Sequence, residues 1–263
     1  MNFGDAFAGA GERALLLPYM MCGVPDAAVT VDLFTAMADA GADGFEIGIP
    51  YADPLMDGPI IQQAGAMALA GGMTLRRGLD LTAEVVATTG LPCAVMTYVN
   101  PILMMGVTEF SKMANDAGAT AAIIADLPVD ESEPFIEAMG AVGLGLVQFA
   151  APTTTDARLD RVVALADPFV YGIAEMGVTG ERDGSTSRAA ELAARVRARS
   201  NVPLVLGVGI SGSEAAAAGA EVADGVIVGT ALVRRVLEAE TPQAACIAVG
   251  ELVSDLATAV GRN

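Results

Sequence analysis

The stretch Gly44-Phe-Glu-Ile-Gly-Ile-Pro-Tyr-Ala-Asp-Pro-Leu-Met-Asp-Gly-Pro59 predicts a buried strand that runs into a loop. Because side chains alternate along a strand, Phe45 and Ile47 fall on one face and Glu46 falls on the other. Three prolines and one glycine follow from position 50 onward, so the strand ends there and Asp57 belongs to the loop. We expect the strand acid and the loop acid to face a common pocket.

Seven further apolar runs alternate with alanine-rich amphipathic segments along the chain. The eight predicted strands are 15–20, 45–49, 94–98, 121–125, 144–150, 169–174, 202–207 and 225–228. The predicted helices are 28–40, 61–70, 75–88, 108–117, 131–141, 156–166, 187–199, 212–219, 230–239 and 243–260. Strict alternation predicts an α/β fold of parallel strands, a (β/α)8 TIM barrel with additional helices in one domain over residues 1–263. A doubly wound open sheet is the alternative, although its glycine fingerprint is missing after the first strand.

Composition excludes several classes of function. The 263 residues include 14 basic and 32 acidic ones, and the net charge of -18 argues against binding to nucleic acid or to an anionic membrane. Residues 85–108 carry no charge, but glycine and prolines interrupt them, so we expect no membrane span. The three distant cysteines and the absence of histidine predict free thiols and no metal site. The N-terminus shows no secretory signal pattern, and we expect a cytoplasmic protein.

Proton transfer in a chain without histidine depends on carboxyl groups. The single lysine, Lys112, falls on a polar-faced predicted helix, which argues against Schiff-base chemistry. In a barrel the active site lies where strands end and loops begin. The candidates there are Glu46, Asp57, Tyr98, Asn100, Asp126 and Tyr171. Taken singly, each also fits an ordinary role as a helix cap or a core residue.

Three glycine-bearing loops follow the last three predicted strands, at 177–180, 207–214 and 228–231. Ser211 and Glu214 have the spacing of a capping box, and Thr230 is placed to cap a helix that opens at the next residue. Unpaired N–H groups at helix starts bind anions, and barrels commonly hold phosphate after strands seven and eight. The pattern therefore predicts a phosphate site, with simple tight turns as the alternative.

The quoted stretch resembles the signature of the tryptophan synthase alpha subunit family. Three more segments extend the resemblance, in the order along the chain that the family has. They are Ala125-Asp-Leu-Pro-Val-Asp-Glu-Ser132, Met176-Gly-Val-Thr-Gly180 and Asp224-Gly-Val-Ile-Val-Gly-Thr-Ala231. The resemblance spans nearly the whole chain. The resemblance implies a TIM barrel and a carbon–carbon lyase of tryptophan biosynthesis, which cleaves indole-3-glycerol phosphate to indole and glyceraldehyde 3-phosphate.

The resemblance also implies the residues that do this work. Glu46 is expected as general acid and base, and Asp57 is expected to bind the indole N–H. The residues expected around the rest of the substrate are Tyr19, Tyr98, Ile123, Tyr171 and Thr179, with Gly180, Gly209, Gly229 and Thr230 at the phosphate. No cofactor is expected in this chain. The implied partner is a beta subunit in an alpha2-beta2 complex, which carries pyridoxal phosphate and is met through Asp53, Pro54 and residues 126–132.

Other functions fit the same residues. A stand-alone lyase would release indole without a partner, and a catalytically weak barrel would serve only as a partner of the beta subunit. Another phosphate-binding barrel, such as a sugar-phosphate isomerase, is a third alternative, although no second general acid exists outside the pair. Indole release measured with and without a beta subunit separates these alternatives.

Overall fold

The computed structural model describes residues 1–173, 182–207, 209–210 and 212–261, with side chains described outside 182–187. Its strands form one sheet of nine, in the order β5-β4-β3-β2-β1-β9-β8-β7-β6, and every pair is parallel. The strands are β1 (Leu15–Met21), β2 (Phe45–Gly48), β3 (Cys93–Thr97), β4 (Ala121–Ile124), β5 (Gly145–Leu146), β6 (Gln148–Ala150), β7 (Val170–Gly172), β8 (Leu204–Leu206) and β9 (Gly225–Val228).

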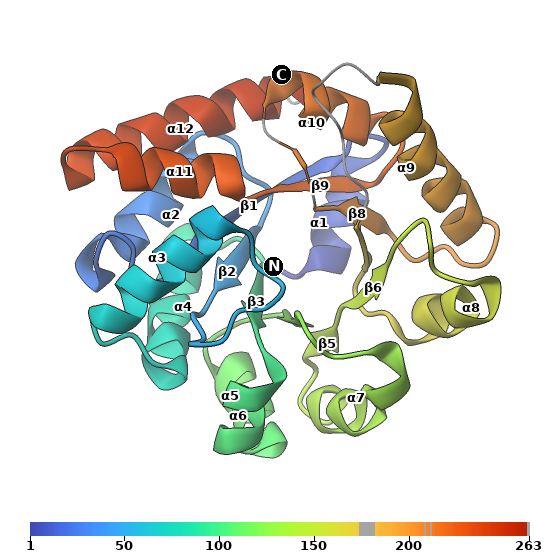
Figure 1. Ribbon diagram of the computed structural model, residues 1–263, viewed down its shortest axis with the longest axis horizontal. Helices are drawn as coiled ribbons and strands as arrows, with labels where there is room; N and C mark the ends of the chain where they lie inside the picture. The colour runs from blue at the N-terminus through green and yellow to red at the C-terminus, as the bar shows by residue number, and fades with distance from the viewer. Residues whose placement is uncertain (174–181, 208, 211, 262–263) are drawn as a thin grey trace.

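The two edges of this sheet belong to one run of chain. The predicted strand 144–150 is divided into β5, which pairs with β4, and β6, which pairs with β7. Only Val147 separates them, and its N–H donates to the carbonyl of Ala122 on β4 at 3.0 Å. The run therefore closes the sheet into the predicted (β/α)8 barrel, and Figure 1 shows the strands at the centre of a ring of helices.

The described helices surround this barrel. They are α1 (Phe3–Ala10), η1 (Ala27–Val29), α2 (Thr30–Asp39), α3 (Pro59–Ala70), α4 (Leu75–Thr89), α5 (Val99–Met105), α6 (Val107–Asp116), η2 (Val129–Glu131), α7 (Glu133–Gly140), α8 (Asp156–Leu165), α9 (Arg182–Arg197), α10 (Ser213–Ala220), α11 (Thr230–Glu238) and α12 (Pro242–Ala259). Among the described residues, none of these helices is long and apolar enough to cross a membrane.

Two helices were not predicted from the sequence. α1 begins with a capping box, in which Asn2 and Asp5 each accept a backbone N–H of the other. No helix was predicted at Asn100 and Pro101, but α5 covers both residues. Pro101 is the third residue of α5, where its missing N–H costs no helical hydrogen bond.

Aspartates stabilise the N-terminal end of the barrel in a repeated way. Asp43, just before β2, donates its N–H to the carbonyl of Leu16 and accepts the N–H of the same residue, both at 2.9 Å. Asp224, just before β9, does the same with Leu204, at 2.9 and 2.8 Å. Arg13 adds a bidentate pair to Asp43 at 2.7 and 2.8 Å. These carboxylates fix adjacent strands in register at the end of the barrel away from the loop acids.

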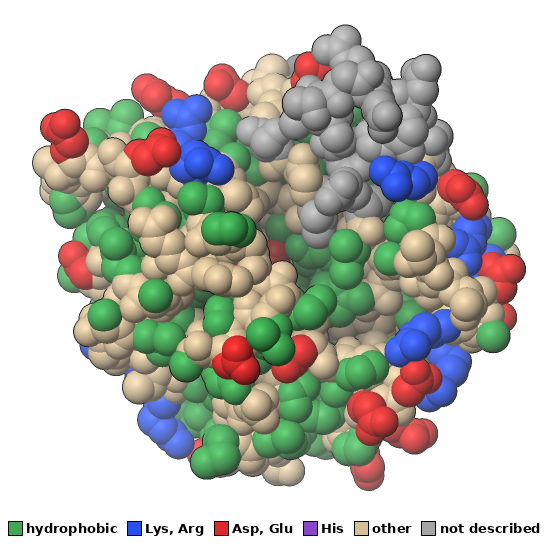
Figure 2. All heavy atoms as spheres, viewed as in Figure 1, with side chains coloured by type: hydrophobic (Ala, Val, Ile, Leu, Met, Phe, Trp, Pro, Cys, Tyr) green, Lys and Arg blue, Asp and Glu red, His purple; other side chains and the backbone are tan. Residues whose placement is uncertain are grey.

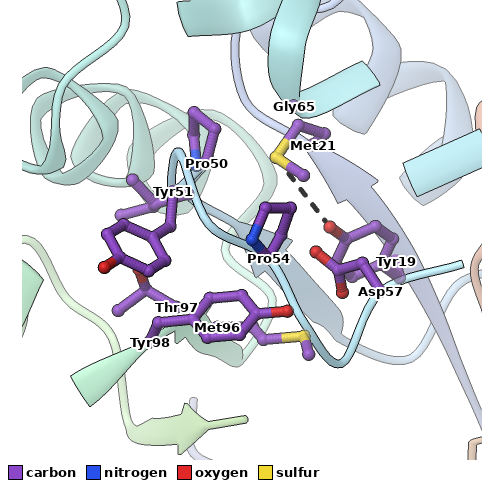
Figure 3. Close-up of a pocket in the computed structure, with 11 residues that line it drawn as sticks. Tyr19, Met21, Pro50, Tyr51, Pro54, Asp57, Gly65, Met96, Thr97 and Tyr98 are labelled. Carbon is purple, nitrogen blue, oxygen red and sulfur yellow. Dashed lines mark hydrogen bonds between the residues drawn. The ribbon is translucent and has the colours of Figure 1, made fainter. Parts of the chain in front are cut away.

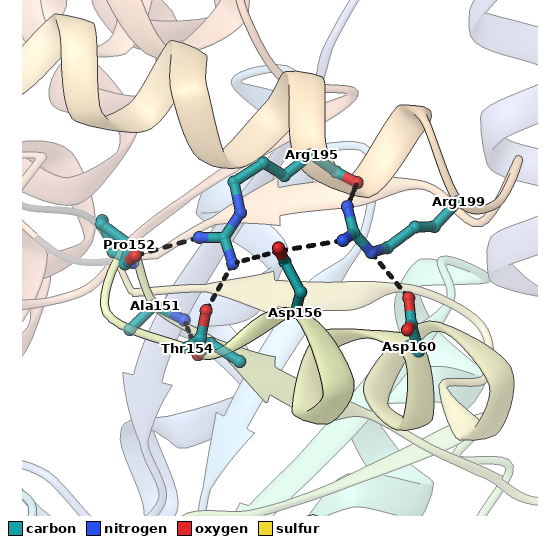
Figure 4. Close-up of polar contacts among 7 residues, drawn as sticks. All are labelled: Ala151, Pro152, Thr154, Asp156, Asp160, Arg195 and Arg199. Carbon is teal, nitrogen blue, oxygen red and sulfur yellow. Dashed lines mark hydrogen bonds and ion pairs between the residues drawn. The ribbon is translucent and has the colours of Figure 1, made fainter.

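Arginines near the end of α9 hold it against the start of α8 (Figure 4). Arg195 donates to the carbonyls of Pro152 and Thr154 and pairs with Asp156 at 3.1 Å. Arg199 pairs with the same carboxylate at 2.8 Å. The loop between β6 and α8 is therefore fixed by the helix that follows β7.

Replacement of Asp43 with alanine is expected to lower the free energy of unfolding by about 2–3 kcal/mol, because it leaves the Leu16 N–H without its acceptor and removes the carboxylate that pairs with the Arg13 guanidinium. The matched control is Asp116→Ala, which removes an exposed pair with Lys112 at 3.7 Å and should cost less than ~0.5 kcal/mol. Urea denaturation measures both values. Equal losses in the two variants would contradict the structural role of Asp43.

Candidate active site

The strand register places three of the predicted site residues, Tyr19, Glu46 and Ile123, on the inner face of one wall of the barrel. Tyr19 on β1 is the register neighbour of Glu46 on β2. Two residues further along β2, Gly48 is the register neighbour of Met96 on β3. Met96 is in turn the neighbour of Ile123 on β4. Register neighbours point to the same face of a sheet. The alternate residue Phe45 points outward and packs edge to face on Phe34, with ring centroids 5.0 Å apart. The predicted alternation around Glu46 is confirmed.

The opposite wall of the barrel contributes Tyr171 and Phe149, which are register neighbours with ring centroids 5.0 Å apart. Phe149 was not among the site residues predicted from the sequence. Alternation along the predicted strand 144–150 would assign Phe149 to one of its two faces, but the division of that run into β5 and β6 hides which face is the inner one. Two aromatic rings therefore face Glu46 across the interior.

Glu46 is the buried acid of this layer. Its side chain is 2% exposed, and its Oε1 has no hydrogen-bond partner among the described residues. Burial raises the pKa of Glu46 to about 8, and the negative charge of Asp57 contributes to the shift. The carboxyl group is therefore mostly protonated at neutral pH, which suits a general acid.

Asp57 lies above the strand ends, on the loop between β2 and α3, where it is half-buried. Burial raises the pKa of Asp57, whereas the Tyr98 hydroxyl opposes that rise. Figure 3 shows the Asp57 carboxyl group between the rings of Tyr19 and Tyr98. The N–H of Met56 donates to the Tyr98 hydroxyl at 3.2 Å, which fixes the loop on β3.

A small hollow opens between this loop and the strand ends. Its lining residues are Tyr19, Met21, Ile49, Pro50, Tyr51, Pro54, Asp57, Gly65, Met96, Thr97 and Tyr98. Glu46 is absent from that set, and its side chain is enclosed within the strand layer. Figure 2 shows this face of the molecule hollowed at the centre of the ring of helices. Glu46 and Asp57 therefore lie at different depths of one site, Glu46 within the strand layer and Asp57 on the loop above it.

Glycines make room for the two inward tyrosines. A methyl group at Gly48 would overlap the Tyr19 hydroxyl, and one at Gly207 would overlap the hydroxyl of Tyr171. Tyr171 donates that hydroxyl to the Gly207 carbonyl at 3.3 Å. The strand ends therefore lack side chains where the aromatic rings need space.

The predicted phosphate residues are described in part. Gly209 has a φ of 80°, a left-handed conformation that favours glycine. The prediction that Thr230 caps α11 was wrong: Gly229 is the N-cap and Thr230 is the first helical residue. α10 begins likewise, with Gly212 as its N-cap. Because glycine has no side chain to accept the first N–H groups, both helix starts keep donors for an anion.

Of the residues predicted at or near the phosphate and substrate, Thr179, Gly180 and Ser211 lie outside the described residues.

Two other candidates at the strand ends have structural contacts. Asp126 accepts the N–H of Val99 at 2.7 Å and so caps α5, as an acid at a strand end often does. Asn100 donates to the hydroxyl of Tyr51 at 2.8 Å. Both residues support the loops around the hollow without lining it.

Fold and site together define a (β/α)8-barrel protein with paired carboxyl groups at the C-terminal mouth. The family model described as tryptophan synthase alpha chain matches residues 7–260. A tryptophan synthase alpha chain of Streptomyces coelicolor is 40% identical over 260 residues, 99% of this chain and 96% of that one. One of Salinispora tropica is 42% identical over 261 residues, 98% and 97% of the two chains.

Solved structures agree with these sequence matches. Tryptophan synthase subunit alpha of Legionella pneumophila superimposes with a TM-score of 0.90 at 31% identity and covers 100% of both chains. A structure of Mycobacterium tuberculosis tryptophan synthase gives 0.88 at 37% identity and covers 98% of this chain and 97% of that one. The chain belongs to the tryptophan synthase alpha chain family, and with it to the lyases of tryptophan biosynthesis.

The raised pKa of Glu46 predicts a pH-dependent stability that the variant E46Q lacks. The folded-state pKa of about 8 lies above the ordinary 4.5, so the folded chain binds the extra proton between these values. The stability that Glu46 contributes is therefore complete below pH 4.5 and is lost as the pH rises through 8.

From about pH 5 to pH 8.5, the free energy of unfolding of the unsubstituted protein should fall by more than ~1 kcal/mol relative to E46Q. Urea denaturation across this range gives both curves. Parallel curves would show that Glu46 ionises normally in the folded state.

Proposed function

We propose that this chain cleaves indole-3-glycerol phosphate to indole and glyceraldehyde 3-phosphate by a retro-aldol reaction. The observation that carries the proposal is the burial of Glu46, which raises its pKa to about 8, close to the charge of Asp57 at the mouth of the barrel. The uncapped glycine starts of α10 and α11 support a phosphate ester as substrate.

The chemistry needs one group that first gives a proton and then takes one. In the proposed mechanism, protonated Glu46 donates its proton to the indole ring carbon that bears the glycerol chain, and the ring becomes positively charged. The carboxylate then accepts the proton of the adjacent glycerol hydroxyl while the carbon–carbon bond breaks. The bonding electrons return to the ring, the hydroxyl carbon becomes the aldehyde, and Glu46 ends protonated.

Asp57 is assigned the opposite electrostatic role. An ionised carboxylate beside the indole N–H stabilises the positive charge that appears when the ring is protonated. Its half-buried position and the neighbouring Tyr98 hydroxyl support the ionised form better than the fully enclosed site of Glu46 does. Tyr171 and Phe149 supply apolar surface for the indole ring.

We also propose that the chain works with a pyridoxal-phosphate-dependent beta subunit in an alpha2-beta2 complex. The loop that contains Asp53 and Pro54 presents Leu55 and Met56, which are 80% and 60% exposed. Exposed apolar side chains next to an active site are typical of a protein interface. Since Met56 also contacts Tyr98, the proposed interface is directly connected to the site of Asp57.

The variant E46Q tests the catalytic assignment. With a beta subunit present, we expect the rate of indole release to fall at least about 10³-fold, because the amide can neither donate nor accept the proton in this step. Asp116→Asn is the control: it changes an exposed acid on α6 that pairs with Lys112 at 3.7 Å, away from the site, and should stay within about threefold of the parent rate.

Indole release is followed with purified protein, alone and with the beta subunit, alongside circular dichroism to verify folding. Parent-like turnover by folded E46Q would refute the role of Glu46. Full activity without the beta subunit would favour the stand-alone lyase, and no activity in either condition would favour a barrel that serves only as a binding partner.

A further inference from the structure

Tyr19 occupies a central position between the two halves of the site. Its strand, β1, pairs with β2, which carries Glu46, on one side and with β9, which leads to Gly229, on the other. A methyl group at Gly229 would lie 3.1 Å from Cδ1 of Tyr19, so the ring also packs against the start of α11. A substrate that spans from the acids to the uncapped helix must cross over Tyr19.

The hydroxyl of Tyr19 is buried without a strong acceptor. The residue is 6% exposed, and among the described residues its one hydrogen bond goes to the sulfur of Met21, at 3.9 Å. A thioether is a weak acceptor, and buried hydroxyls normally find a better one. Figure 3 shows this hydroxyl beside the Asp57 carboxyl group, and both residues line the hollow.

The other inward tyrosine differs in this respect. Tyr171 donates its hydroxyl to the Gly207 carbonyl at 3.3 Å, so its hydrogen already has an oxygen acceptor. Burial, with the charge of Asp57, holds the pKa of Tyr19 well above its usual range, and the group keeps its hydrogen at physiological pH. Tyr19 is thus a neutral hydrogen-bond donor that has no oxygen acceptor among the described residues.

We propose that the Tyr19 hydroxyl donates a hydrogen bond to a hydroxyl oxygen of the substrate's three-carbon chain and so selects substrates that carry that oxygen. The inference rests on the proposed function, because it takes the ring at the acids and the phosphate at α10 and α11. Between these two ends only the glycerol segment lies over β1, and its oxygens are stronger acceptors than the Met21 sulfur, to which the Tyr19 hydroxyl donates among the described residues.

The test compares Tyr19→Phe with the unsubstituted protein for two ligands, in the complex with the beta subunit. Indole-3-glycerol phosphate is the substrate, and 3-(indol-3-yl)propyl phosphate, which lacks both chain hydroxyls, is the competitive inhibitor. We expect Y19F to raise KM for the substrate about 3- to 10-fold, the effect of one lost hydrogen bond. Its inhibition constant for the propyl analogue should change less than about twofold, since that ligand never made the bond.

Tyr171→Phe is the matched control, because it removes a hydroxyl from the same pocket that is already bonded to the protein. It should affect substrate and analogue equally. The inference is overturned if Y19F weakens both ligands alike, weakens neither, or shifts their ratio no more than Y171F does. These outcomes differ from failure of the proposed function, in which the unsubstituted protein itself releases no indole and both proposals fall.

Discussion

The burial of one carboxyl group inside a closed parallel barrel is the constraint on which the rest of this structure depends. Glu46 sits in the middle of β2, where both neighbouring strands hold its backbone and no described group satisfies its Oε1. An ionised carboxylate in such surroundings is strongly disfavoured, so the group keeps its proton at neutral pH. The barrel thereby supplies an acid of suitable strength without histidine.

The two ends of the barrel treat their acids in opposite ways. At the N-terminal end, Asp43 and Asp224 accept backbone N–H groups and arginine contacts, and they stabilise strand pairing. At the C-terminal end, Glu46 and the hydroxyl of Tyr19 remain without strong partners among the described residues. Unsatisfied polar groups lower stability, and their concentration at the mouth is what a ligand-binding site requires.

Most of the barrel could be predicted from the sequence because its signals are local. The alternation around Glu46 and the spacing of the eight apolar runs depend on residues adjacent in the chain. The division of 144–150 into β5 and β6 could not be predicted, since barrel closure decides it and no local pattern marks Val147. α5 was missed for a different reason: Pro101 indicates a loop unless the helix start is known to lie two residues earlier.

The sequence placed Glu46 on a buried strand and Asp57 on the loop after it, as the structure does, but it did not predict the packing around them. Phe149 was missed because its partner Tyr171 lies on another strand, and the roles of Gly48 and Gly207 become visible only when the tyrosine rings are placed against them.

Infrared difference spectroscopy of the folded protein against E46Q measures directly whether the buried Glu46 carboxyl group keeps its proton. The carbonyl band of a protonated Glu46 should persist at neutral pH and titrate near 8. Loss of that band near the ordinary value of 4.5 would contradict this prediction.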